Sequence, residues 1–161
     1  MLRVRGALRV EMTALDRRAR DLAREETTCH RLMTVPGVGP LTALTFMSAV
    51  DDPGRSRSSK RVGAHFGLTP KKHQSRETDI IGGITKAGDG MARSMLYEAA
   101  KAMLTRTQSL SRLKAWGLRI AQRRGLNRAI VAVARKLATV LHRKWVDGTT
   151  FRFGKEDVPV A

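Results

Sequence analysis

The chain has 161 residues, of which 42% are hydrophobic and only 4% aromatic, which favours aliphatic cores between packed helices. Its 31 lysines and arginines against 14 acidic residues give a net charge of +17, and nucleic acid is the polyanion that best neutralises such a charge. A single cysteine, Cys29, excludes an internal disulfide and fits the reducing cytoplasm, and no apolar run or signal-peptide core directs the chain to a membrane.

Residues 1–31 predict a helical arm. Apolar residues recur alternately at four and three positions, as in a coiled-coil seam: Leu8, Met12, Leu15, Ala19 and Leu22. The seam predicts pairing with a second copy, while a single amphipathic helix lying on its own domain explains the same two heptads. The abrupt helical start predicts a chain cut from something longer.

The strongest local signal is the turn Val35-Pro36-Gly37-Val38-Gly39, followed by a helix predicted over Pro40–Val50. Glycines let a backbone turn tightly and approach a ligand, and free amides at the start of a helix attract phosphate. We therefore predict a helix-hairpin-helix in which Val35, Gly37, Val38 and Gly39 contact the DNA backbone, with Val38 and Leu41 anchored in the core. A plain interhelical turn is the alternative.

A short helix capped by Ser58 and ended by Gly67 should lead into a small β-hairpin near 68–83. This region holds Ser75 among Lys71, Lys72, Arg76 and Lys86. A serine hydroxyl in such a setting can attack phosphorus while the cations stabilise the developing charge. On composition alone, a serine that merely hydrogen-bonds phosphate or water is the more frequent case.

Metal ligands are sparse in the sequence. The four histidines lack zinc-site spacing, and the neighbouring Glu77 and Asp79 are too few for a two-metal nuclease centre. We therefore predict no metal site in this chain.

Three further helices should follow Gly88-Asp89-Gly90, the last with apolar residues at regular helical spacing: Ile130, Val133, Ala134, Leu137, Leu141 and Trp145. Residues 94–146 contain twelve basic residues and one acidic residue, Glu98. The sequence thus predicts a mainly α fold in four parts: an arm (1–31), a helix-hairpin-helix domain (32–105), basic C-terminal helices (106–147) and a frayed tail (148–161).

Several motifs in register resemble one known family. They are LMTVPGVGPLTA at 32–43, SKRVGAHFGLTP at 59–70, QS at 74–75, GITKAGD at 83–89 and RSMLY at 93–97. Together they resemble the C-terminal domain of IS110/IS116/IS902 insertion-sequence transposases. The resemblance implies DNA transposition through a serine ester, with Ser75 as nucleophile. We also predict that five basic residues contact the nucleic acid: Lys71, Lys72, Arg76, Lys86 and Arg93.

The resemblance also implies a RuvC-like domain with acidic Mg²⁺ ligands, a dimer or tetramer formed through the arm, and in some members a structured guide RNA. That acidic domain is missing here, and Arg76 stands where the family pattern has glycine. We interpret the chain as a truncated transposase acting on DNA in the bacterial cytoplasm, at the nucleoid, with its enzymatic competence undecided. The alternatives are a non-catalytic helix-hairpin-helix nucleic-acid-binding module and a ribosome- or tRNA-associated protein.

Overall fold

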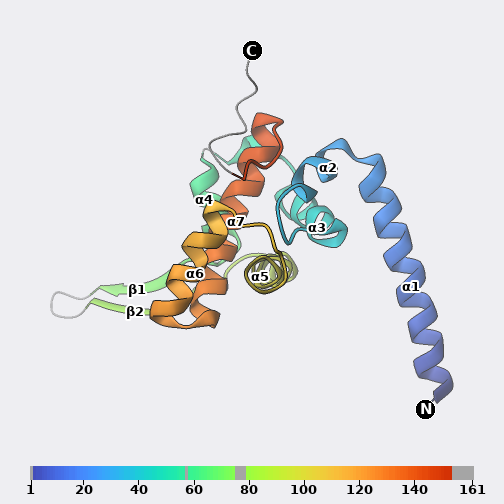
Figure 1. The fold of residues 1–161 in the computed structure, drawn as a ribbon, viewed down its shortest axis with the longest axis horizontal. Helices are drawn as coiled ribbons and strands as arrows, with labels where there is room; N and C mark the ends of the chain where they lie inside the picture. The colour runs from blue at the N-terminus through green and yellow to red at the C-terminus, as the bar shows by residue number, and fades with distance from the viewer. Residues whose placement is uncertain (1, 57, 75–78, 154–161) are drawn as a thin grey trace.

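The computed structural model describes residues 2–56, 58–74 and 79–153, where helices dominate around one small antiparallel sheet (Figure 1). The elements in chain order are α1 (Leu2–Glu25), α2 (Thr27–Met33), α3 (Pro40–Val50), the 3-10 helix η1 (Pro53–Arg55), α4 (Ser59–His65), β1 (Pro70–Gln74), β2 (Asp79–Ile84), α5 (Gly90–Thr105), α6 (Arg112–Arg124) and α7 (Leu126–Asp147). The mainly helical fold with a small hairpin is confirmed. Within the described ranges, no helix combines the length and the apolar character needed to pass through a bilayer.

Helix α7 forms the centre of the core. Five of the six apolar positions that the sequence period predicts are at most 1% exposed: Ile130, Val133, Ala134, Leu137 and Leu141. The sixth, Trp145, is partly buried and packs against the core. Helix α7 packs against α4, α5 and α6, and against α2 as well. On α3, the ring of Phe46 lies 5.7 Å from that of Phe66 and 6.4 Å from that of Trp145, between ring centroids, which joins α3 to the ends of α4 and α7.

Short polar residues begin three of the helices. The Ser58 hydroxyl accepts a hydrogen bond from the Lys60 amide at 3.3 Å, and the Ser111 hydroxyl accepts one from the Lys114 amide at 3.1 Å. Asp89 accepts from the first two amides that follow Gly90, at 2.7 and 2.9 Å. These bonds satisfy amides that a helix leaves free at its start. The predicted cap at Ser58 and the predicted bounds of α3 are both confirmed.

A buried histidine joins three elements. The His142 side chain on α7 is 2% exposed. Its Nε2 lies 3.0 Å from the Pro53 carbonyl oxygen of η1, and its Nδ1 lies 2.9 Å from the Ser59 hydroxyl of α4. Because a carbonyl only accepts, Nε2 donates there, and the Ser59 hydroxyl satisfies the other ring nitrogen. His142 therefore links α7 to η1 and to the start of α4.

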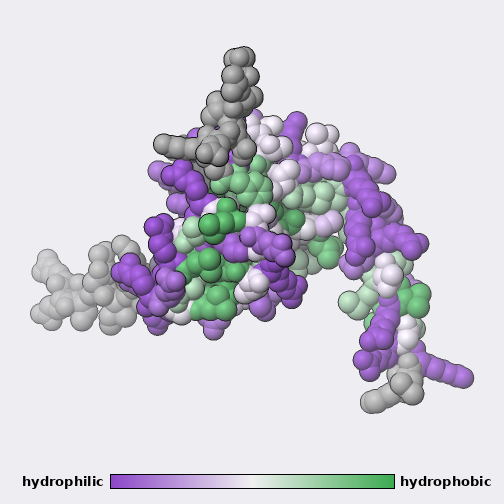
Figure 2. Space-filling view, in the orientation of Figure 1, coloured by the Kyte–Doolittle hydropathy of each residue, from purple (hydrophilic) through white to green (hydrophobic). Residues whose placement is uncertain are grey.

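Helix α1 leaves the body as an arm (Figure 1). Near its C-terminal end Ala23 is fully buried, and this end packs against α2 and α3. By contrast Leu8 is 59% and Leu15 is 64% exposed, and Figure 2 shows apolar side chains in the open along the arm. The structure thus shows a projecting arm, and the alternative of a helix lying along its own domain is wrong.

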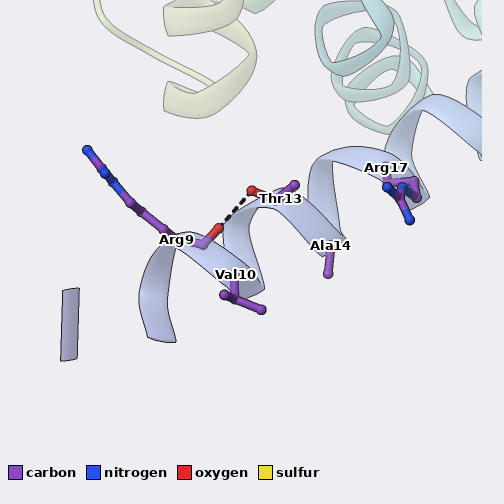
Figure 3. Close-up of a pocket in the computed structure, with 5 residues that line it drawn as sticks. All are labelled: Arg9, Val10, Thr13, Ala14 and Arg17. Atoms are coloured by element: carbon purple, nitrogen blue, oxygen red, sulfur yellow. Dashed lines mark hydrogen bonds between the residues drawn. The ribbon is translucent and has the colours of Figure 1, made fainter. Parts of the chain in front are cut away.

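The surface of the arm offers no enclosed site. A hollow on α1 is lined by Arg9, Val10, Thr13, Ala14 and Arg17 (Figure 3). All five residues come from the one helix, and the single bond among them joins the Thr13 hydroxyl to the Arg9 carbonyl within that helix. No second element closes over this hollow, so a small-molecule pocket is not formed there.

The beginning of the C-terminal tail is held against the body. Gly148 ends α7 in the left-handed conformation, with φ of +64°. Three residues later, the Phe151 amide donates to the Thr34 hydroxyl at 2.9 Å, and the Phe151 side chain packs on the core. Residues 148–151, which were expected to fray, are thus held against the body, and residues 154–161 lie outside the described residues.

Candidate nucleic-acid interface

The turn between α2 and α3 is anchored by two valines. Val35 is 1% and Val38 is 7% exposed. The Val35 amide donates to the Leu32 carbonyl and the Val38 amide to the Val35 carbonyl, each at 3.1 Å. With both side chains inside the core, only the backbone of these two predicted contact residues can face a ligand.

Gly37 makes the closest approach of the turn, and it approaches α5. Its φ is +85°, and a Cβ built on it would lie 2.3 Å from the Ala99 carbonyl oxygen and 2.9 Å from the Met103 amide nitrogen. Such distances are far inside van der Waals contact, so glycine is required by the protein's own packing. The sequence predicted that the missing side chain made room for DNA; in the structure helix α5 fills that room.

The start of α3 is open. Gly39 has extended backbone, and a Cβ there would meet no described atom within 4 Å. Gly39 provides no side-chain cap and Pro40 has no amide hydrogen, so the Leu41 and Thr42 amides are the first two free donors of the helix. Leu41 is 47% exposed, which corrects its expected place in the core. This uncapped end of α3 has the polarity and the space to receive a phosphate.

The predicted hairpin is present. Strands β1 and β2 pair antiparallel from Pro70 opposite Ile84 to Gln74 opposite Asp79, with a register shift next to Pro70. Lys71 is exposed on β1. Of Lys72 the structure describes only the backbone, paired with that of Ile81. Ser75 and Arg76, the predicted nucleophile and its neighbour, lie outside the described residues, between the end of β1 and the start of β2.

The base of the hairpin is held by tight backbone packing. The Lys86 amide donates to the Gly67 carbonyl at 3.1 Å. Gly67 (φ +64°) and Gly88 (φ +75°) both leave no room for a side chain, because a Cβ on Gly88 would lie 1.9 Å from the His65 carbonyl oxygen. Lys86 itself has φ of +57°, a conformation uncommon outside glycine, and its side chain is exposed. The backbone thus fixes where this lysine leaves the hairpin.

Arg93 on α5 clamps this base. Its Nη1 donates to the Phe66 carbonyl at 3.2 Å and to the Ala87 carbonyl at 3.1 Å. A guanidinium that bridges two carbonyls fixes the end of α4 to the residues that follow β2. Sequence reasoning assigned Arg93 to nucleic acid and missed this role, because both partners are backbone atoms that no motif reveals.

The site residues therefore form two groups along one helix. Arg93, near the start of α5, holds the base of the hairpin, while Ala99 and Met103 receive the Gly37 turn. At 1.5 Å of rise per residue the two groups lie roughly 9–15 Å apart along α5. Among the described helices and strands, each hairpin strand packs extensively only on the other strand.

Ion pairing does little to neutralise the basic residues. The five ion pairs found among the described residues all join neighbours on one helix or turn, and none involves Lys71, Lys86 or Arg93. No three histidine, cysteine or acidic side chains cluster within the described ranges. These residues therefore do not fit the acidic magnesium centre that the family resemblance implies.

A basic helical domain with an open helix end and a lysine-bearing hairpin has the features of a module that handles nucleic acid. The family model described as "Transposase IS116/IS110/IS902 family" matches residues 29–115, which include the turn, the hairpin and α5. The chain belongs to this transposase family, and the resemblance seen in its motifs is confirmed.

Individual relatives agree with the family match. The chain is 34% identical over 134 residues to the transposase for insertion sequence element IS1111A of Coxiella burnetii, covering 83% of this chain and 37% of the relative. It is 33% identical over 147 residues to the putative transposase y4pF/y4sB of Sinorhizobium fredii, covering 90% and 38%. For the transposase of element IS1328 of Yersinia enterocolitica, identity is 29% over 147 residues, covering 91% and 44%. The chain thus spans less than half the length of these relatives.

Proposed function

We propose that this chain is the DNA-handling part of an insertion-sequence transposase that breaks and rejoins strands through a serine ester. The family match across residues 29–115 is the observation that carries the proposal. It encloses a hairpin with exposed Lys71 and Lys86 at its base, and Ser75 falls between the two strands in the sequence. The proposed site of action is bacterial DNA in the cytoplasm, at the nucleoid.

In the proposed reaction the Ser75 oxygen attacks a phosphodiester phosphorus. A seryl phosphoester forms as the bond from phosphorus to one sugar oxygen breaks; the hydroxyl proton passes to solvent, and the departing sugar oxygen takes up a proton. Attack by a second strand's hydroxyl on the same phosphorus then releases the serine. Lys71, Lys72, Arg76 and Lys86 stabilise the charge on the phosphate oxygens.

The turn has a separate task in this proposal. The open start of α3 holds the backbone of the duplex through the Leu41 and Thr42 amides, with Gly39 leaving that approach clear. The backbone from Val35 to Gly39 lies beside it.

The exposed seam of α1 supports a further part of the proposal, the assembly of two or four copies. Leu8, Met12 and Leu15 are 59–67% exposed on a helix that leaves the body. Pairing with the same helix of another copy would cover them. A structured guide RNA is a second polyanion that the net charge of +17 would accommodate.

The test of catalysis is capture of a covalent protein–DNA adduct. The chain is incubated with element-end DNA and with the portion of a relative that this chain does not span, such as that of the IS1111A transposase. We expect a denaturant-resistant adduct with the unchanged chain and with Ser109→Ala, an exposed serine, and none with Ser75→Ala. An adduct that persists in Ser75→Ala, or none in any chain, would overturn the proposed chemistry.

A non-catalytic nucleic-acid-binding module is the second candidate. It is favoured by Arg76 in place of the family's glycine and by the lack of an acidic cluster among the described residues. Gly39→Asp probes the binding role common to both candidates. An aspartate there caps the Leu41 and Thr42 amides, which preserves stability, and places a carboxylate where a phosphate would sit. We expect weaker DNA binding with unchanged or higher stability, whereas Gly39→Ser should retain most of the binding.

A further inference from the structure

A stripe of arginines runs along the outer face of α6. Arg112, Trp116, Arg119 and Arg123 follow one another at intervals of four, three and four residues. The three arginines are exposed, while Trp116, at the edge of this face, is partly buried and packs against the core. At that spacing they occupy about 60° of the helix circumference over a length of roughly 16 Å. The three arginines, named here the arginine stripe, are all exposed, and none forms an ion pair with a described residue.

The packing of α6 fixes the direction of the stripe. Gly117 is the point of closest approach to the core, because a Cβ there would lie 2.6 Å from Val133 Cγ2 and 2.7 Å from Leu104 Cδ2. At about 100° per residue, Gly117 lies about 130° around the helix from the centre of the stripe. Lys136 on α7 places its Nζ 5.8 Å from the centre of the Trp116 ring, which adds a fourth cation beside the arginines.

The charge pattern of α6 differs from that of the solvated arm in the same chain. Helix α1 interleaves seven arginines with four acidic residues, and Arg20 and Arg24 pair with Asp16 and Asp21. Helix α6 has five basic residues and no acidic one. On α7 the only acidic residue is the last one, Asp147, which pairs with Arg143. A helix that needed only solubility would mix its signs as α1 does.

We propose that the arginine stripe docks on the phosphate backbone of a DNA duplex, at a second binding surface beyond the turn and the hairpin. This inference rests on the proposed function in taking DNA as the polyanion. Duplex DNA carries one charge per ~1.7 Å of axis, so a length of duplex equal to the stripe has about ten phosphates on its two strands, more than the three arginines need. Arginine forks bind phosphate bidentately, and a helix fits the wide major groove of B-DNA better than the narrow one of A-form RNA.

Helix α6 lies apart from the arm. In Figure 1, α6 lies across the body from α1, on the side from which the hairpin of β1 and β2 projects. The family match ends at residue 115, so Arg119, Arg123 and Lys136 fall beyond it. Figure 2 shows hydrophilic residues beside an apolar patch in this part of the body, as expected where an amphipathic helix keeps one side in solvent.

Salt-dependent binding tests the proposal. The whole chain, carrying Ser75→Ala so that strand cleavage plays no part, is titrated with a duplex of arbitrary sequence at several KCl concentrations, followed by fluorescence anisotropy. The triple variant Arg112→Gln, Arg119→Gln, Arg123→Gln should weaken binding at least tenfold at moderate salt. It should also flatten the slope of log K against log[salt] by about 2.7, because each lost phosphate contact removes about 0.9.

Two matched variants control for fold and net charge. Arg3→Gln, Arg5→Gln and Arg9→Gln together remove the same charge from the arm and should leave most of the slope. The triple variant Arg112→Lys, Arg119→Lys, Arg123→Lys should retain the slope of log K against log[salt], because the three positive charges remain. Three results would overturn the proposal. The first is an unchanged salt slope in the α6 glutamine triple, and the second is an equal flattening of the slope in the arm triple. The third is weaker binding of the α6 glutamine triple to an RNA duplex of the same sequence but not to the DNA duplex. None of these results depends on whether Ser75 forms an adduct.

Discussion

The substitution Gly37→Ala tests whether the packing of the turn against α5 requires glycine at this position. The added methyl would lie 2.3 Å from the Ala99 carbonyl oxygen and 2.9 Å from the Met103 nitrogen. Both are backbone atoms of α5, so neither can rotate away. The positive φ adds about 1–2 kcal/mol for an L-residue, and overpacking of a core contact adds about 1–3 kcal/mol. We therefore expect the free energy of unfolding to fall by about 2–5 kcal/mol.

Gly39→Ala is the matched control two residues away. Gly39 has φ of −100°, and its Cβ would meet no described atom within 4 Å. Alanine is only a poorer cap than glycine, so we expect a loss below about 1 kcal/mol. Urea unfolding followed by far-ultraviolet circular dichroism measures both changes. In a thermal scan, a chain of this size should lose about 2–4 °C of Tm per kcal/mol, so the Gly37 variant should melt at least about 4 °C lower.

Equal urea midpoints for Gly37→Ala and Gly39→Ala, with unchanged m-values, would refute the packing argument. If Gly37→Ala instead kept full stability and lost DNA binding, the glycine would face the ligand as the sequence alone suggested. A destabilised Gly37→Ala says nothing about DNA, which is why the binding role of the turn is tested at Gly39.

Three other predictions follow from the structure. Arg93→Gln should speed amide exchange in both hairpin strands and cost about 1.5–3 kcal/mol, because two charge-assisted bonds are lost; exchange equal to that of the exposed control Arg106→Gln would contradict the clamp. Burial, and to a lesser extent the Glu26 carboxylate, raises the pKa of the Cys29 thiol in the folded chain. The free energy of unfolding should therefore fall as the pH rises past the ordinary thiol pKa of about 8.5, because the unfolded chain loses the thiol proton first. Cys29→Ala should abolish this fall, and a fall that persists in Cys29→Ala would show that other groups cause it. Phe151→Ala should cost about 1–2 kcal/mol and expose the Thr34 region to proteolysis, while Phe153→Ala should have a smaller effect; equal effects would contradict tail docking.

Local features of the fold could be predicted because they depend on residues that are close together in the sequence. The Ser58 cap, the bounds of α3 and the buried face of α7 each depend on residues within a few turns of one another. The small hairpin was also predicted, since Pro70 and the paired glycines before Ile84 interrupt helical spacing. In these segments the local preference and the tertiary fold agree, which is the condition under which pattern reading succeeds.

Features that depend on distant backbone could not be predicted. The pattern Pro36-Gly37 looks the same whether the glycine meets DNA or α5, and only the 2.3 Å approach to Ala99 distinguishes the two. Arg93 likewise resembles any basic residue in a nucleic-acid-binding motif until its two carbonyl partners are known. Leu41 was expected in the core because it follows the turn, but the first turn of α3 presents it to solvent.

Helix α5 makes the two predicted surfaces one mechanical unit. Its first turns hold the hairpin base through Arg93, and its second half seats the turn through Gly37. A helix is stiff over a span of roughly 9–15 Å, so the open end of α3 and the base of the strands that flank Ser75 keep a fixed separation. If the turn holds one stretch of DNA backbone, the phosphate presented to the hairpin is determined by that separation. Alanine at Gly37 should then disturb the position of the hairpin as well as stability, and hydrogen exchange at Thr85, on the hairpin side of Arg93, is where that coupling would be measured.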